Sequence, residues 1–211
     1  KKLNGAVVLP GESFSFNERV GARSEANGFK TAKIIVGGEY TEGIGGGVCQ
    51  VSTTLYNAAL LAGMRVTAVR GHTIQPSYVP PSLDAMVNSS TSDLCFVNPF
   101  DTPVFIAAET DSDESVAVVT FYGHVLPYTI KAVSREITHA SVPADREEVD
   151  KERKYVGDAP AGTRVRVSYG HAKVTSESFL RYFTLSGQFI KEEKIRTDTY
   201  AETKGLIAVA P

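Results

Sequence analysis

Residues 43–62 read GIGGGVCQVSTTLYNAALLA, in which a run of glycines leads directly into a long helical pattern. From Val48 to Ala62 the apolar residues recur at helical spacing, and Gly63 follows as the residue that ends the predicted helix. Glycines at 45–47 cost conformational entropy on folding, so they indicate a backbone that approaches something closely or adopts positive φ. Their spacing matches neither common phosphate-binding glycine pattern, so no nucleotide site is predicted.

Cys49 falls in the first turn of this predicted helix, immediately after the glycines. A helix N-terminus carries partial positive charge and unpaired N–H groups, which lower the pKa of a cysteine and favour the thiolate. The same amides can bind an oxyanion that develops on a peptide carbonyl. We therefore predict that Cys49 is a catalytic nucleophile, with substrate or oxyanion contacts from Gly46, Gly47, Val48 and Gln50.

One face of the predicted helix carries short, uncharged polar side chains. At about 100° per residue, Thr53, Asn57 and Gln50 fall on the same side as Cys49, whereas the apolar residues lie elsewhere. A polar stripe of this kind is typical of a solvated face. Because it contains no Lys or Glu, it also suits the floor of a cleft that hydrogen-bonds a substrate. Thr53 and Asn57 are therefore substrate-binding candidates.

His72 is the best-placed base for a thiol nucleophile among the four histidines. It follows the strand predicted after the helix and opens a proline-rich loop that can cross the same cleft. The alternative is a surface histidine at a strand end, and the other three histidines are expected to be structural or surface residues. Asp84, Tyr78 or a backbone carbonyl can orient the ring, and the sequence does not choose among them. Tyr78 and Asp84 are also candidates for substrate contact.

The composition argues against several classes of function. The chain has 22 Lys and Arg against 24 Asp and Glu, and no basic cluster carries interleaved aromatics, so nucleic acid is not an expected partner. No apolar run approaches the roughly 18 residues of a membrane span. Cys49 and Cys95 show no metal-ligand spacing, so we expect no metal and no cofactor. Their surroundings differ, which disfavours a disulfide between them, and Cys95 is expected to be a small buried hydrophobe.

The rest of the chain predicts strands and turns. For residues 1–127 we predict an α+β fold, with a mixed or antiparallel sheet packed around one central helix that carries Cys49 at its N-terminus. Residues 128–211 are predicted to form a small, extended all-β module. Strands are expected at residues 6–9, 13–16, 33–36, 64–69, 94–97, 104–108 and 116–122, with turns at Gly37-Gly38 and Asp111–Glu114.

Three ordered motifs resemble the signature of the VanW family: residues 43–58, PGESFSFN at residues 10–17, and HTIQPSYVPPSLDA at residues 72–85. Ser82 and Thr73 depart from the pattern, which often has glycine and serine at these places. The resemblance covers residues 3–126 and implies a VanW-type catalytic domain at residues 1–127. Residues 128–211 resemble, more loosely, the G5-like β module that commonly follows.

This resemblance implies a bacterial protein associated with vancomycin resistance and an L,D-transpeptidase activity that forms 3-3 cross-links between peptidoglycan stem peptides. Cys49 and His72 match the family's cysteine and histidine. The implied location is the extracellular face of the membrane or the cell wall. The start at Lys1 looks like the interior of a longer protein, so membrane contact is expected only through a segment outside this chain, and a monomer is expected.

Two alternatives stay open. A cysteine-dependent peptidoglycan hydrolase would use water in place of the acceptor amine. A non-catalytic cell-wall-binding or accessory module would use the glycines and Cys49 only to shape a groove.

Overall fold

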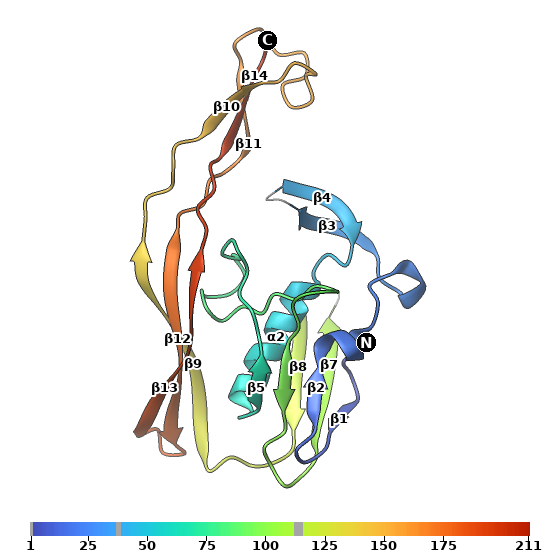
Figure 1. The fold of residues 1–211 in the computed structure, drawn as a ribbon, viewed down its shortest axis with the longest axis vertical. Helices are drawn as coiled ribbons and strands as arrows, with labels where there is room; N and C mark the ends of the chain where they lie inside the picture. The colour runs from blue at the N-terminus through green and yellow to red at the C-terminus, as the bar shows by residue number, and fades with distance from the viewer. Residues whose placement is uncertain (1, 37–38, 112–115) are drawn as a thin grey trace.

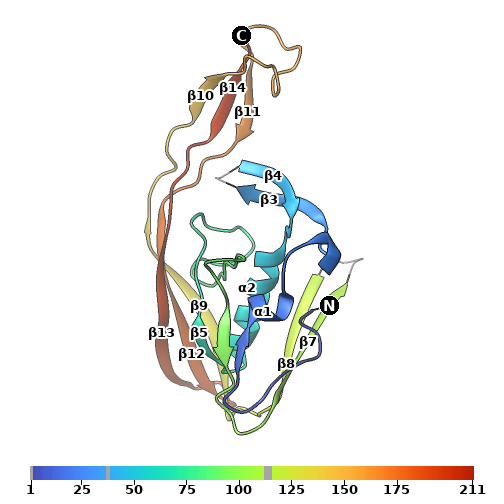
Figure 2. The same cartoon turned by 45° about the vertical axis from the view of Figure 1, so that its right-hand side comes forward.

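The computed structural model describes residues 2–36, 39–111 and 116–211. The molecule is elongated (Figure 1): helix α2 lies among small sheets, and a long ribbon runs along one side toward a distal sheet at the C-terminus. The same arrangement is visible from a second side (Figure 2). Strands hold 42% of the residues and helices 11%, so the protein is mostly β.

The first part of the chain contains short helices, one long helix and small antiparallel sheets. The helical elements are α1 (Phe16–Val20), the 3-10 helix η1 (Glu25–Asn27) and α2 (Val48–Leu61). The strands are β1 (Ala6–Val8), β2 (Ser13–Ser15), β3 (Thr31–Val36), β4 (Glu39–Ile44), β5 (Arg65–Ala68), β6 (Cys95–Val97), β7 (Val104–Asp111) and β8 (Val116–Tyr122). They pair as β1-β7-β8, β2-β6-β5 and the hairpin β3-β4.

The predicted α+β fold, with one sheet around a central helix, is wrong. Helix α2 does lie among the strands, but these divide into separate sheets of two or three strands. The physical reason is strand length, because β1, β2 and β6 have three residues each and offer few ladder hydrogen bonds. The turn predicted at Gly37-Gly38 lies outside the described residues, as does the turn after Asp111 from Ser112 on.

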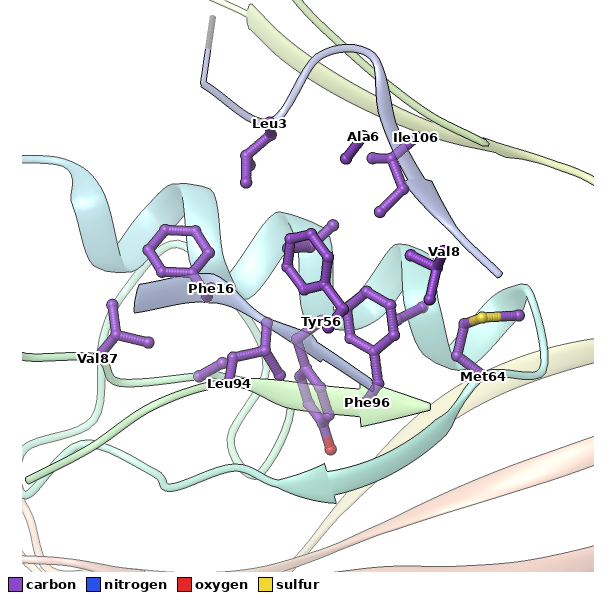
Figure 3. Close-up of a cluster of buried hydrophobic side chains, with 14 of the residues drawn as sticks. Leu3, Ala6, Val8, Phe16, Tyr56, Met64, Val87, Leu94, Phe96 and Ile106 are labelled. Carbon is purple, nitrogen blue, oxygen red and sulfur yellow. The ribbon is translucent and has the colours of Figure 1, made fainter. Parts of the chain in front are cut away.

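The core lies between α2 and the sheets beside it (Figure 3). Leu55 and Tyr56 of α2 are fully buried, and Phe96 of β6 stacks on Phe14 with 4.8 Å between ring centroids. The hydroxyl of Tyr56 points out of this cluster. Burial of aromatic and branched side chains from distant segments holds the short strands together where their few hydrogen bonds would not.

The second part of the chain is a ribbon that continues into a distal sheet. β9 (Tyr128–His139), β12 (Val174–Thr184) and β13 (Phe189–Tyr200) pair antiparallel in the order β13-β12-β9. β10 (Arg146–Val149), β14 (Leu206–Val209) and β11 (Arg164–Ser168) form the distal sheet, in which β10 and β14 are parallel.

The ribbon packs against the core of the first part through Ala132, Leu180 and Ile195. Helix α2 also contacts β9 directly. Apolar contacts therefore cross the boundary that the sequence predicts after residue 127, and a division into two independent domains stays a prediction.

Phe96→Ala should lower the free energy of unfolding by about 3–5 kcal/mol, because it opens a cavity in a buried aromatic cluster. Urea unfolding followed by circular dichroism measures the loss. Phe105→Ala on β7 is a matched control: this ring is 51% exposed, so its loss should stay within about 1 kcal/mol. Equal losses in the two variants would contradict the assigned core.

Candidate active site

Two glycines set the start of α2. Gly45 and Gly47 have φ of 96° and 83°, in the left-handed region that residues with a Cβ rarely adopt, and Gly47 is the N-cap of the helix. Cys49 is the second residue of α2 and is half-buried. The glycines therefore let the chain turn sharply into the helix immediately before the thiol.

The amides predicted to bind an oxyanion fall into two groups. The N–H groups of Val48 and Gln50 already donate to carbonyls of the same turn, at 3.3 and 3.1 Å. Within the described part of the chain, the amides of Gly46, Gly47 and Cys49 make no hydrogen bond. These three amides are the ones available to a substrate oxygen, and their role in binding it stays a prediction.

His72 lies four residues beyond the end of β5, and its ring is held by Asp84. Its Nδ1 is 2.6 Å from Asp84 Oδ2, and the same oxygen accepts the His72 backbone N–H at 2.6 Å. Of the groups that the sequence left open for orienting this ring, Asp84 is the one that the structure brings to Nδ1. Because Nδ1 is bonded to Asp84, Nε2 is the ring nitrogen that remains for another partner.

The Cys49 thiol and the His72 ring each shift the pKa of the other. Burial by itself raises the pKa of the thiol, but hydrogen bonds with His72 and the Val87 backbone, and the charges of His72 and Arg23, lower it below its ordinary value. Burial likewise opposes protonation of His72, yet hydrogen bonds with Asp84 and Cys49 raise its pKa to about 9. Both shifts favour the charged forms, a thiolate on Cys49 and an imidazolium on His72.

Asp84 is fully buried, and both of its carboxylate oxygens have partners. His72 occupies Oδ2, while the Tyr200 hydroxyl and Arg196 Nη2 donate to Oδ1 at 2.6 and 2.9 Å. Burial alone would raise the pKa of Asp84, but these hydrogen bonds and the guanidinium charge lower it. The carboxylate stays ionised and stabilises the protonated form of His72.

The polar side chains of α2 bind the chain's own backbone. Ser52 Oγ donates to the Ala85 carbonyl at 2.6 Å, and Thr53 Oγ1 accepts the Ala85 N–H at 3.0 Å. Asn57 Nδ2 donates to the Leu83 carbonyl at 2.8 Å. These bonds fix the segment that carries the buried carboxylate onto the helix. Contact of Thr53 or Asn57 with a substrate stays a prediction.

Tyr78 borders the thiolate–imidazolium pair on its accessible side. Its ring meets that of His72 edge-on, with 6.4 Å between centroids. Tyr78 is 42% exposed, so a substrate can reach it. Gln50 is exposed on the first turn of α2.

Sequence reasoning missed four residues that build this site. Ser52 lies on the polar side of α2, and its place beside Thr53 was the available signal. Arg23, Arg196 and Tyr200 come from segments far from Cys49 in the chain, and no spacing or motif marks them.

Cys95 lies outside the site. Both cysteines are free, and Cys95 is half-buried beside Asp93. Burial and this carboxylate raise the pKa of its thiol to about 11. In the described ranges, His, Cys, Asp and Glu side chains form no group that could hold a metal ion. None of the helices there is long and apolar enough to cross a bilayer.

Comparisons with known proteins give a family for the first part of the chain. A family model described as "VanW like protein" matches residues 1–122. "Uncharacterized protein YoaR" of Bacillus subtilis is 46% identical over 109 residues, which are 52% of this chain and 36% of that protein. "Vancomycin B-type resistance protein VanW" of Enterococcus faecalis is 28% identical over 124 residues, which are 56% of this chain and 45% of that protein. The chain thus spans less than half the length of each relative.

One solved structure, "Crystal structure of HP0197-G5", matches 39% of this chain and 96% of its own, at 11% identity and a TM-score of 0.19. A score this low carries no argument about fold, so the G5-like description of residues 128–211 stays a prediction.

Cys49 should react with iodoacetamide faster than free cysteine at about pH 6 to 7, because its lowered pKa gives it a larger thiolate fraction than free cysteine has. The rate should fall as the pH drops through this pKa and level off above it. Cys95 is an internal control whose pKa of about 11 keeps it slow over the same range. Mass spectrometry of tryptic peptides separates the two sites, and equal rates would contradict the ion pair.

Proposed function

The chain belongs to the VanW-like protein family, and on that premise we propose that it is a cysteine-dependent L,D-transpeptidase acting on peptidoglycan stem peptides. The observation that carries the proposal is the His72 ring bonded to the buried Asp84 carboxylate, together with the coupling between this ring and the Cys49 thiol that lowers the pKa of the thiol. A thiolate activated by an oriented histidine suits acyl transfer. The family resemblance, rather than the geometry, supports the choice of substrate.

In the first half-reaction, the Cys49 thiolate attacks the carbonyl carbon of the L,D bond that follows meso-diaminopimelate in a donor tetrapeptide. A C–S bond forms, and the carbonyl oxygen becomes an oxyanion for which the Gly47 and Cys49 amides are donors. The C–N bond then breaks, and the His72 imidazolium gives its proton to the departing amine of D-Ala. A thioester on Cys49 and a neutral His72 result.

In the second half-reaction, the side-chain amine of an acceptor diaminopimelate attacks the thioester carbonyl. The new C–N bond forms, the C–S bond breaks, and His72 Nε2 takes the proton that the amine loses. The thiolate–imidazolium pair is thereby restored. Asp84 keeps Nδ1 protonated throughout, so that Nε2 is the atom that gives and takes the proton.

A peptidoglycan substrate implies that the protein acts at the extracellular face of the bacterial membrane or in the cell wall. Acylation of Cys49 is common to transpeptidation and hydrolysis, which differ only in whether an amine or water resolves the thioester. The nucleophile is therefore tested separately from the acceptor.

Incubating the protein with purified tetrapeptide muropeptides should yield cross-linked dimers and free D-Ala, measured by mass spectrometry. Cys49→Ala should abolish both products, whereas Cys95→Ala, which alters a thiol outside the site, should retain them. His72→Ala should slow the reaction by about 10²–10⁴-fold.

Shortened monomers without dimers would assign a hydrolase instead. A protein that forms neither product, or a fully active His72→Ala variant, would contradict the mechanism. A non-catalytic wall-binding module would retain muropeptides without changing their mass.

A further inference from the structure

Strand β13 of the ribbon lies directly behind the segment that carries His72 and Asp84. Arg196 and Tyr200 of this strand reach the Asp84 side chain. In both ribbon views the loop after β5 lies between α2 and the ribbon (Figures 1 and 2). Both β13 residues lie outside the residues 1–122 that the family model matches.

Arg196 holds this segment by several atoms. Its Nη2 donates to the Asp84 backbone carbonyl at 2.6 Å and to Asp84 Oδ1 at 2.9 Å, while Nε donates to the Ser82 carbonyl at 3.1 Å. Asp198 forms a second ion pair with it at 2.8 Å, and the guanidinium lies 5.4 Å from the centre of the Tyr56 ring. The side chain is only 12% exposed, so these contacts are shielded from solvent.

Tyr200 joins the same network from a fully buried position. Its hydroxyl donates to Asp84 Oδ1 at 2.6 Å and accepts the Ser82 N–H at 2.6 Å. One oxygen thus connects the carboxylate to the backbone that precedes it. Ser82 itself has φ of 61°, the left-handed backbone that glycine adopts most readily, so its contacts with β13 support a strained turn.

The backbone on both sides of His72 is docked on β13 and on the residue that follows it. At Gly71 a Cβ would lie 2.7 Å from Asp198 Oδ1, so the chain approaches β13 more closely than a side chain would allow. Beyond His72, the Thr73 carbonyl accepts the Ala201 N–H at 2.7 Å. The position of the histidine therefore depends on the ribbon as well as on the helix.

We propose that Arg196 and Tyr200 are positioning residues for the Cys49–His72 pair, so that the ribbon is a working part of the active site. They act through Asp84, which they hold in place for His72, and they touch no reacting atom. The inference rests on the proposed function for its catalytic consequence. Its effect on the reactivity of Cys49 is independent of any substrate.

The charges around Asp84 give the expected direction of change. Arg196 is shared by Asp84 and Asp198, so its removal leaves two carboxylates close to the site without their cation. Added negative potential disfavours the thiolate, and a displaced Asp84 no longer orients His72, so both effects make Cys49 less reactive at neutral pH. Arg23 and Tyr78 also interact with the Cys49–His72 pair, and Tyr56 interacts with the charges of Arg196, Asp198 and Asp84.

The test is the rate of Cys49 alkylation by iodoacetamide across pH in the full chain. Arg196→Gln should slow it about tenfold or more near about pH 6.5 and move its pH midpoint upward. Arg196→Lys keeps the charge without the fork of donors, so it should restore part of the rate. Tyr200→Phe removes one oxygen and should slow the reaction about threefold or more.

Two matched controls lie on the same ribbon but away from Asp84. Arg135 Nη1 pairs with Glu192 at 2.9 Å, and the Tyr182 hydroxyl donates to Glu193 at 2.9 Å, both at exposed positions. Arg135→Gln and Tyr182→Phe should therefore leave the rate and its pH midpoint unchanged. Circular dichroism verifies that each variant is folded.

Rates within about twofold of the parent protein in Arg196→Gln and Tyr200→Phe would overturn the inference, as would equal losses in the two controls. If Arg196→Gln does not fold, Tyr200→Phe decides alone. If the β13 variants slow alkylation but the parent protein turns over no muropeptide, the proposed function is wrong and the inference stands. If the parent protein turns over muropeptides but the variants alkylate at the parent rate, the inference is wrong and the proposed function stands.

Discussion

The ionised carboxylate of Asp84 has no access to solvent, and much of the surrounding architecture meets that condition. A buried carboxylate is destabilising unless hydrogen bonds and opposite charge replace the water that it lost. Here the backbone and ring of His72 hydrogen-bond to Oδ2, and Arg196 and Tyr200 donate to Oδ1. These partners come from the loop on one side and the ribbon on the other. Neither part of the chain can satisfy the carboxylate alone.

The same requirement explains the unusual surface of α2. The segment at residues 83–87 is assigned to no sheet, so its backbone groups lack the partners that a ladder would supply. Side chains of the helix take that place: Ser52 and Thr53 bond to Ala85, and Asn57 bonds to Leu83. A polar stripe on a largely buried helix is thereby accounted for by an irregular backbone packed along it. The cysteine and the carboxylate are held in register by the same helix.

Local features of the site could be predicted from the sequence, whereas non-local ones could not. The helix was expected at Val48–Ala62 and is observed at Val48–Leu61, because glycines and apolar spacing act within a few residues. Fold class depends instead on which distant strands pair, such as Ala6 with Ile106, and no local pattern encodes that pairing. The bounds of β9 could not be read from the sequence, because a ribbon strand that is solvated on much of its surface carries charges where a core strand alternates.

Among the site residues the same division holds. His72 follows Cys49 closely in the chain and could be proposed as its partner. Arg196 is 112 residues from the carboxylate it binds, and an arginine on a charged strand gives no sign of that contact. Asp84 was one of several candidates because a proline-rich loop has no period from which its path can be read.

Taken in order through space, the charged groups alternate in sign from one side of the site to the other. His72 and Arg196 each lie between two anions, and the charged forms of Cys49, His72 and Asp84 are stabilised by their neighbours. The protonation of one group then depends on the charges of the others, so the thiolate fraction of Cys49 is set by the whole series of charged groups rather than by Cys49 alone. One end of this series belongs to the loop after α1 and the other to β13, which makes the reactivity of the thiol a property of the whole fold. The series consists of Arg23, Cys49, His72, Asp84, Arg196 and Asp198.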